Sequence, residues 1–255
     1  MFNRLIIWLC VFIVGTGSVA FAEEKPVVSA YAYHLKPPFI IDPLQESGLC
    51  YDYSRLLSEL SDVEFFTLFI PRKRLNRLLS DGGFDGIVLG ANPLWFKDAD
   101  KKKYLWSDPL IKDRDEFISL KSSKFDYVDP KSLLRHSLAG VRGFYYGKVE
   151  KAKAYGPIKR FDTIGEKEVL DMVVKGRADI GIISRSTLNY MRSLKPSEYE
   201  VLYLSRVPHE EYSRYVMLPN KRQKLHTKIV ALMRSPEYQA RWKKLVAKYN
   251  LKYED

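Results

Sequence analysis

The sequence predicts an α/β protein of two similar lobes, each a mixed and mostly parallel sheet flanked by helices. Three observations lead to this fold class. Apolar strand-like runs alternate with helical segments in the first half, the alternation begins again near residue 138, and two helices close the chain. With 255 residues, 46% of them hydrophobic, the chain can form one large or two modest domains.

The first half is expected to alternate strands and helices. The run VVSAYA is apolar and β-branched, and two prolines that cannot continue a central strand soon follow it. Apolar residues then recur at three- and four-residue steps, as in an amphipathic helix. The predicted elements are a strand at 27–32, a helix from 48 to 60, a strand at 64–70, a helix from 71 to 80 and a strand at 85–90.

The second half repeats this order and then becomes helical. GGFDGIVLG and KGRADIGII each place a glycine turn before an aspartate and an apolar strand, which indicates two related lobes. Ser184 and Ser235 are expected to cap helices, and the aromatic stripe of the last helix is expected to pack in the core. The predicted elements are a strand at 138–143, a helix from 166 to 175, a strand at 178–183 and helices at 184–190, 221–234 and from 236 onwards.

Residues 1–22 have the pattern of a secretory signal peptide. Arg4 precedes a ten-residue apolar run, and Ala20-Phe21-Ala22 supplies the small residues that a signal peptidase accepts. We therefore expect cleavage after Ala22 and a periplasmic protein. Cys10 lies inside the apolar run without the small residues of a lipoprotein site, and Cys50 alone remains afterwards, so no internal disulfide is expected.

The charge and the histidine content limit the partners. The formal net charge is +11, and no nucleic-acid-binding module is visible, so nucleic acid is not an expected partner. The positive charge could favour an anionic ligand or an anionic membrane face, or serve solubility alone. Four histidines without metal-ligand spacing predict neither a metal site nor a cofactor.

An ordered series of short motifs resembles one known family. Behind the predicted signal peptide come Y-x-x-x-P-P-F, G-x-x-Y-D, P-R-K-R-L-N-R-L-L, W-S-D-P-L, G-V-R-G-F-Y-Y-G and G-R-A-D-I-G-I-I. Each is weak alone, but their order is similar to that of the bacterial periplasmic solute-binding proteins of the family 3 type. These proteins have the type 2 periplasmic binding fold and include amino-acid receptors of ABC transporters.

The resemblance implies a two-lobed clamshell that closes on a ligand. Lobe 1 would comprise residues 23–118, lobe 2 residues 119–212, and residues 213–255 would return to lobe 1 with the C-terminal helices. Two crossing strands, near Glu116–Leu120 and within Val201–Tyr215, would form the hinge. The ligand would lie between the lobes, where the carboxyl ends of the strands converge.

The resemblance also implies a set of ligand-binding residues. Phe39 would offer an aromatic wall, although it could equally pack under its loop, and the cations at the start of the helix at 71–80 would face an anion. The implied set is Tyr33, Phe39, Arg72, Arg74, Asn92, Trp95, Lys97, Tyr145, Tyr146, Ser184 and Arg185.

Two departures from the family pattern bear on the ligand. The arginine that clamps an amino-acid carboxylate falls on Lys97 when counted from Asp85, and on Asp100 when counted from Ser107. The aspartate that holds the ligand amine is replaced by Ser184. Both changes favour a polar or anionic solute over an ordinary α-amino acid. In the segment that follows Lys97, residues 98–103 are expected to be a solvated helix face, and Trp106 is expected to anchor the segment to the lobe.

The sequence therefore favours a monomeric, non-catalytic receptor of a small molecule that serves an ABC importer or a membrane sensor. Two alternatives stay open. An enzyme on the same clamshell, such as a dehydratase or a glycan lyase, would need a carboxylate with a raised pKa in the cleft. The third possibility is a ligand-free interaction module.

Overall fold

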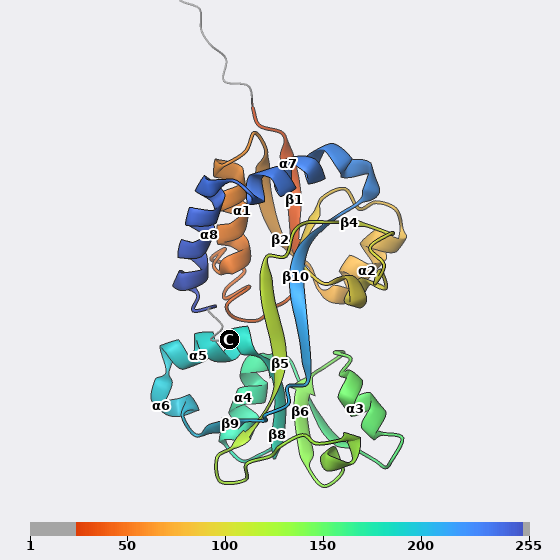
Figure 1. Ribbon diagram of the computed structural model, residues 1–255, viewed down its shortest axis with the longest axis vertical. Coiled ribbons are helices and arrows are strands. Elements are labelled where there is room, and N and C mark those ends of the chain that lie inside the picture. The colour runs from red at the N-terminus through yellow and green to blue at the C-terminus, as the bar shows by residue number, and fades with distance from the viewer. Residues whose placement is uncertain (1–23, 252–255) are drawn as a thin grey trace, which may run out of the picture.

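The computed structural model describes residues 24–251 and shows two α/β lobes joined by two long strands (Figure 1). The predicted signal peptide at 1–22 lies outside the described residues. Among the residues that are described, no helix is both long and apolar enough to cross a membrane. The predicted α/β class with two lobes is confirmed.

The first lobe combines the N-terminal third of the chain with its C-terminal helices. Strand β1 pairs in parallel with β2 and β3, which is the arrangement that strand–helix–strand units produce. Its elements are β1 (Val27–Ala32), α1 (Leu49–Glu59), β2 (Glu64–Phe69), α2 (Arg72–Ser80), β3 (Ile87–Ala91), η1 (Pro93–Phe96), β4 (Leu105–Trp106), η3 (Asn220–Arg222), α7 (Gln223–Met233) and α8 (Pro236–Lys248).

The second lobe is built from the middle of the chain. Strand β6 pairs in parallel with β7 and β8, and helices α4 and α5 pack against this sheet. Its elements are η2 (Pro130–Leu133), β6 (Ser137–Val141), α3 (Gly147–Ala152), β7 (Lys159–Thr163), α4 (Glu166–Val174), β8 (Ile180–Ser184), α5 (Arg185–Leu194), α6 (Pro196–Tyr199) and β9 (Leu202–Leu204).

Strands β5 (Ile111–Leu120) and β10 (Glu210–Leu218) cross from one lobe to the other. They pair with each other in antiparallel fashion, Ile111–Asp115 against Glu210–Arg214. The order β2-β1-β3-β10-β5-β8-β6-β7 therefore runs through both lobes. The shared pairing lies just before the predicted crossing segment at Glu116–Leu120, because β5 turns to pair with β8 from Asp115 onwards.

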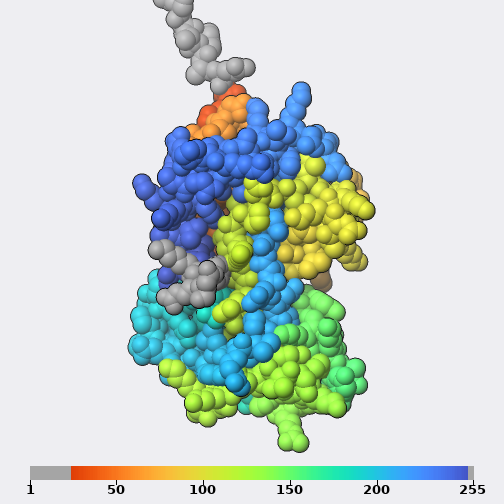
Figure 2. All heavy atoms as spheres, viewed as in Figure 1, coloured from red at the N-terminus to blue at the C-terminus, as the bar shows by residue number. Residues whose placement is uncertain are grey.

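Each lobe has its own apolar core. In the first lobe, α1 and α8 bring together Tyr53, Tyr238 and Trp242, so the predicted core role of the C-terminal aromatic stripe is confirmed. In the second lobe, α4 packs on β8 and β6. Figure 2 shows orange N-terminal and dark blue C-terminal atoms together in the upper lobe, while the middle of the chain forms the lower one.

The expected helix face at residues 98–103 is wrong. The segment is a series of turns after η1, organised by the buried side chain of Asp98. Its carboxylate accepts hydrogen bonds from the backbone N–H groups of Lys102, Lys103 and Tyr104 and from Nε1 of Trp106. These bonds hold the pKa of Asp98 below its ordinary value although burial acts to raise it. A carboxylate that accepts four N–H groups replaces helical hydrogen bonds as the source of local order.

Candidate functional site

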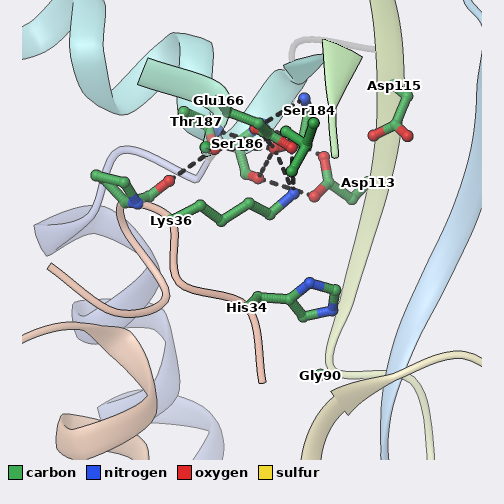
Figure 3. A network of polar contacts seen from close by, with 12 residues as sticks. His34, Lys36, Gly90, Asp113, Asp115, Glu166, Ser184, Ser186 and Thr187 are labelled. Atoms are coloured by element: carbon green, nitrogen blue, oxygen red, sulfur yellow. Dashed lines mark hydrogen bonds and ion pairs between the residues drawn. The ribbon is translucent and has the colours of Figure 1, made fainter. Parts of the chain in front are cut away.

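The two lobes meet at a buried ion pair. Lys36, in the loop after β1, places its Nζ 2.6 Å from Oε1 of Glu166, the first residue of α4. The two side chains are only 5% and 4% exposed. Nζ also donates to Oγ of Ser184 at 3.0 Å (Figure 3). Nearby, Oγ1 of Thr187 donates to the carbonyl oxygen of Pro37 at 2.6 Å. These polar contacts between the two lobes therefore stabilise their closed arrangement.

Two helix starts place the acceptors of the second lobe. Ser184 ends β8 and caps α5, as predicted, by accepting from the backbone N–H of Thr187. Glu166 opens α4, where the positive end of the helix dipole favours a carboxylate. Its Oε2 accepts from the backbone N–H of Ser184 at 3.1 Å and from its hydroxyl at 2.8 Å. The second lobe thus presents a set of oxygen acceptors that suits an ammonium group.

A second buried ion pair lies on the crossing strands. Nε and Nη2 of Arg214 lie 3.1 and 3.0 Å from Oδ2 of Asp113, and these side chains are 1% and 0% exposed. Oγ of Ser186 donates to the same oxygen at 2.8 Å. Burial alone would raise the pKa of Asp113, but Arg214, Lys36 and the Ser186 hydrogen bond hold it below its ordinary value. Burial likewise opposes the charge of Arg214, yet Tyr212 and Asp113 raise its pKa, so the pair stays ionised.

Three aromatic rings surround the guanidinium of Arg214. Its Cζ lies 4.4 Å from the ring centroid of Phe39, 5.0 Å from that of Tyr212 and 5.2 Å from that of Trp95. Rings within about 6 Å of a cation attract it through their quadrupole. Phe39 comes from the loop after β1 and Trp95 from η1, which follows β3, whereas Tyr212 lies on β10. The predicted aromatic wall therefore lies directly against the buried guanidinium of Arg214.

His34 adds a hydrogen-bond donor to this site. Its Nε2 lies 3.2 Å from Nη1 of Arg214. Because a guanidinium only donates, Nε2 accepts and the ring proton is on Nδ1. Within residues 24–251, this buried Nδ1 has no hydrogen-bond partner. The ring lies between the ion pair of Lys36 with Glu166 and the backbone at Gly90 (Figure 3). An acceptor atom of a bound solute would satisfy it.

We expect His34 to make the protein less stable below neutral pH. Burial first, then the charges of Arg214 and Lys36, hold the pKa of His34 well below its ordinary value. The unfolded chain therefore takes up a proton that the folded protein refuses, and stability falls as the pH drops below about 6.5. In urea unfolding, the native protein should lose about 1–2 kcal/mol more between pH 7 and pH 5 than His34→Gln. Equal losses in both proteins would contradict this role of His34.

The structure brings some of the predicted site residues to this junction and places others beside it. Those at the junction are Tyr33, Phe39, Trp95 and Ser184. Arg72 lies alongside, where its guanidinium donates to the carbonyl oxygen of Trp95 and packs 4.0 Å from the ring centroid of Phe96. Asn92 caps η1 and donates to the carbonyl oxygen of Ser213 on β10 at 2.8 Å, so it holds the Trp95 loop against a crossing strand.

The remaining predicted residues lie elsewhere in this conformation. Those on the exposed surface are Arg74, Lys97 and Tyr145. Tyr146 is buried, and its hydroxyl accepts from the backbone N–H of Val141 at 3.0 Å. Arg185 forms an ion pair with Glu116 at 2.7 Å. A role of these residues in ligand binding stays a prediction.

Sequence reasoning missed most of the charged groups at the junction. They are Lys36, Asp113, Glu166 and Arg214. A signal exists for Asp113 and Arg214, because acidic and basic residues inside strands that must be covered on both faces are rarely buried unless they are paired. The runs IKDRDEF and EEYSRYV have this composition.

Comparison with known proteins decides the fold family. No protein-family model matches the sequence, and no curated protein matches it at a significant level.

Solved structures do match. A mutant of ArgBP from T. maritima is 18% identical, with 88% of this chain and 95% of that chain covered and a TM-score of 0.66. An ancestral arginine-binding protein bound to arginine is 14% identical, with 89% and 99% covered and a TM-score of 0.68. The GluR0 ligand-binding core in complex with L-glutamate is also 14% identical, with 88% and 98% covered and a TM-score of 0.68. The chain has the fold of the family 3 solute-binding proteins.

In this solute-binding fold, Lys36 and Glu166 lie beyond the carboxyl ends of β1 and β7, and they meet Ser184 at the carboxyl end of β8. Such ends converge on the crevice of an open α/β sheet, where ligands bind. The similarity to the solved structures is a similarity of fold, whereas the two buried ion pairs are features of this chain's own side chains.

Proposed function

We propose that this protein is a non-catalytic solute receptor, which captures a small polar or anionic solute between its lobes for an ABC importer or a membrane sensor. The observation that carries the proposal is the convergence of buried polar groups from both lobes, Lys36 against Glu166 and Arg214 against Asp113, beside the aromatic rings of Phe39 and Trp95. A few oriented polar groups beside aromatic surface are typical of small-molecule sites.

Lys36 bears on the class of solute. The resemblance assigns the position of Ser184 to the group that holds a ligand amine, and here the ammonium of Lys36 lies 3.0 Å from Oγ of Ser184. An α-amino acid would have to compete with this tethered amine. A solute that offers acceptors would not, and it would satisfy the Nδ1–H group of His34. We therefore favour a polar or anionic solute without an ammonium group.

Binding can be tested by a thermal-shift screen of carboxylates, phosphorylated metabolites, neutral polar compounds and α-amino acids. A ligand at 100 times its dissociation constant stabilises the folded state by about 2.7 kcal/mol. Turnover of a compound would support the enzyme alternative, and silence across the panel would support a ligand-free module. A strong response to α-amino acids alone would overturn the proposed solute class.

Truncating Trp95 should weaken the binding of any solute that the screen identifies. The ring is half-buried between Tyr212 and His34, at centroid distances of 4.8 and 5.6 Å. We expect Trp95→Ala to raise the dissociation constant in calorimetry by at least about tenfold, or about 1.4 kcal/mol. The matched control is Tyr155→Ala, which removes an aromatic ring that is 56% exposed on the second lobe. Equal affinities of Trp95→Ala and the native protein would remove Trp95 from the site.

The proposed location is the periplasm, with the first 22 residues removed after Ala22. The sequence pattern at residues 1–22 supports this location. The intact mass of protein recovered from a periplasmic extract tests it, because a chain that keeps these residues would exclude cleavage at Ala22.

A further inference from the structure

Three side chains that can bind metal ions meet where the crossing strands enter the second lobe. They are Asp115 of β5, Glu210 at the start of β10 and His209 immediately before it. One ligand atom from each lies within 4.8 Å of the other two. Ligands about 2 Å from a common ion lie within about 4 Å of each other, so small rotations of the half-buried carboxylates would complete a site.

Strand pairing forces the two carboxylates together. Asp115 and Glu210 are direct partners in the antiparallel pairing of β5 with β10, and the backbone N–H of His209 donates to the carbonyl oxygen of Asp115 at 2.7 Å. Like charges directly opposite each other across a strand pair are destabilising. A positive charge between them would remove this repulsion.

No protein cation takes that position in residues 24–251. In the described part of the chain, the hydroxyl of Tyr212 donates to Oδ1 of Asp115, Oδ2 has no partner, and the Glu210 carboxylate makes no hydrogen bond or ion pair. The ammonium of Lys148 is directed to the carbonyl oxygen of Pro208 instead, at 2.6 Å.

His209 is the independent sign of a missing partner. The residue is 4% exposed, and neither of its ring nitrogens has a hydrogen-bond partner within the described part of the chain. Its ring packs edge-on against Phe117 and Tyr146, with centroid distances of 5.5 and 5.4 Å. A buried imidazole with two unsatisfied nitrogens is costly, and the neutral ring is the form that ligates metal ions.

We propose that Asp115, His209 and Glu210 form a site for a divalent transition-metal ion. Two carboxylate oxygens and one imidazole nitrogen suit Zn²⁺ or Mn²⁺, whereas Mg²⁺ and Ca²⁺ prefer ligand sets made only of oxygen. Local spacing in the sequence could not indicate the site, because Asp115 belongs to the other crossing strand. The site borders the proposed solute site, because the hydroxyl of Tyr212 donates to Oδ1 of Asp115 at 2.7 Å, but the proposal does not require a bound solute.

Calorimetric titration of the untagged, chelator-treated protein with ZnCl₂, MnCl₂ and MgCl₂ tests the proposal. We expect one Zn²⁺ per chain, weaker Mn²⁺ and no measurable Mg²⁺ binding. Glu210→Gln and His209→Phe should each weaken Zn²⁺ binding by about tenfold or more. The matched control is Glu211→Gln, which removes the neighbouring carboxylate, 68% exposed and 3.7 Å from Arg114, and should bind Zn²⁺ like the native protein.

Several outcomes would overturn the site. They are no Zn²⁺ or Mn²⁺ binding to the native protein, unchanged affinity in Glu210→Gln, or an equal loss in Glu211→Gln. His209→Phe keeps an aromatic ring against Phe117 and Tyr146, and its circular dichroism shows whether it folds. If it does not fold, Glu210→Gln decides the question, because its half-buried side chain changes in charge with little change in shape.

Discussion

Replacing Arg214 by methionine is expected to lower the free energy of unfolding by about 3–5 kcal/mol. Methionine retains an apolar side chain against Phe39 and Tyr212 but leaves Asp113 buried without its cation. The hydrogen bond from Ser186 remains, yet a neutral hydroxyl cannot replace a guanidinium that contacts the carboxylate through two nitrogens. Urea unfolding followed by circular dichroism measures the loss.

A double variant separates the buried charge from simple loss of packing. Arg214→Met combined with Asp113→Leu removes both charges, and apolar replacements of a buried ion pair are often neutral or stabilising. Most of the lost stability should therefore return. The exposed Arg142 provides a matched control, because Arg142→Met should change stability by no more than about 0.5 kcal/mol. A double variant as unstable as Arg214→Met alone would show that packing, and not the charge of Asp113, sets the cost.

Much of the fold could be predicted because its signals are local. The caps at Ser184 and Ser235 depend on a side chain and a backbone N–H group three residues later, and both are present. The aromatic stripe of α8 follows helical periodicity, and its core role needed no knowledge of distant residues. The prediction of a helix at residues 98–103 was wrong because the structure there depends on one side chain and not on a periodic pattern. The carboxylate of Asp98 accepts hydrogen bonds from Lys102 and Trp106, and hydrophobic periodicity does not reveal such bonds.

The site was harder to predict because strand register and lobe closure create it. Asp113 meets Arg214 only because β5 pairs with β10, and Lys36 meets Glu166 only because the two lobes close. Sequence reasoning instead favoured cations at helix starts, such as Arg185, which the structure pairs with Glu116. It was easier to predict that Phe39 and Trp95 lie near the lobe junction, because the segments that follow the carboxyl ends of strands converge in this fold class.

Truncating Lys36 to alanine should open the lobes. The change leaves the carboxylate of Glu166, only 4% exposed, without its ammonium partner in the closed state. A buried charge that loses its partner costs about 3–5 kcal/mol, and opening lets water reach it. The equilibrium should therefore shift towards an open conformation, because only the closed one carries this cost. Small-angle X-ray scattering should show a larger radius of gyration for Lys36→Ala than for the native protein. Lys224→Ala, which removes an exposed lysine of the first lobe, should leave the radius unchanged.

Chemical rescue would show whether the acceptors of the second lobe recognise an ammonium group as such. In Lys36→Ala, n-propylammonium can enter the space of the missing side chain and place its charge against Glu166 and Ser184. We expect it to restore the smaller radius and to raise the melting temperature of this variant, with no such effect on the native protein, where Lys36 holds the position. By the same logic, α-amino acids should bind Lys36→Ala more tightly than the native protein, which would identify Lys36 as the group that excludes them. An equal response to propan-1-ol would show that the alkyl chain alone fills the space, and an unchanged radius in Lys36→Ala would show that the ion pair does not hold the lobes closed.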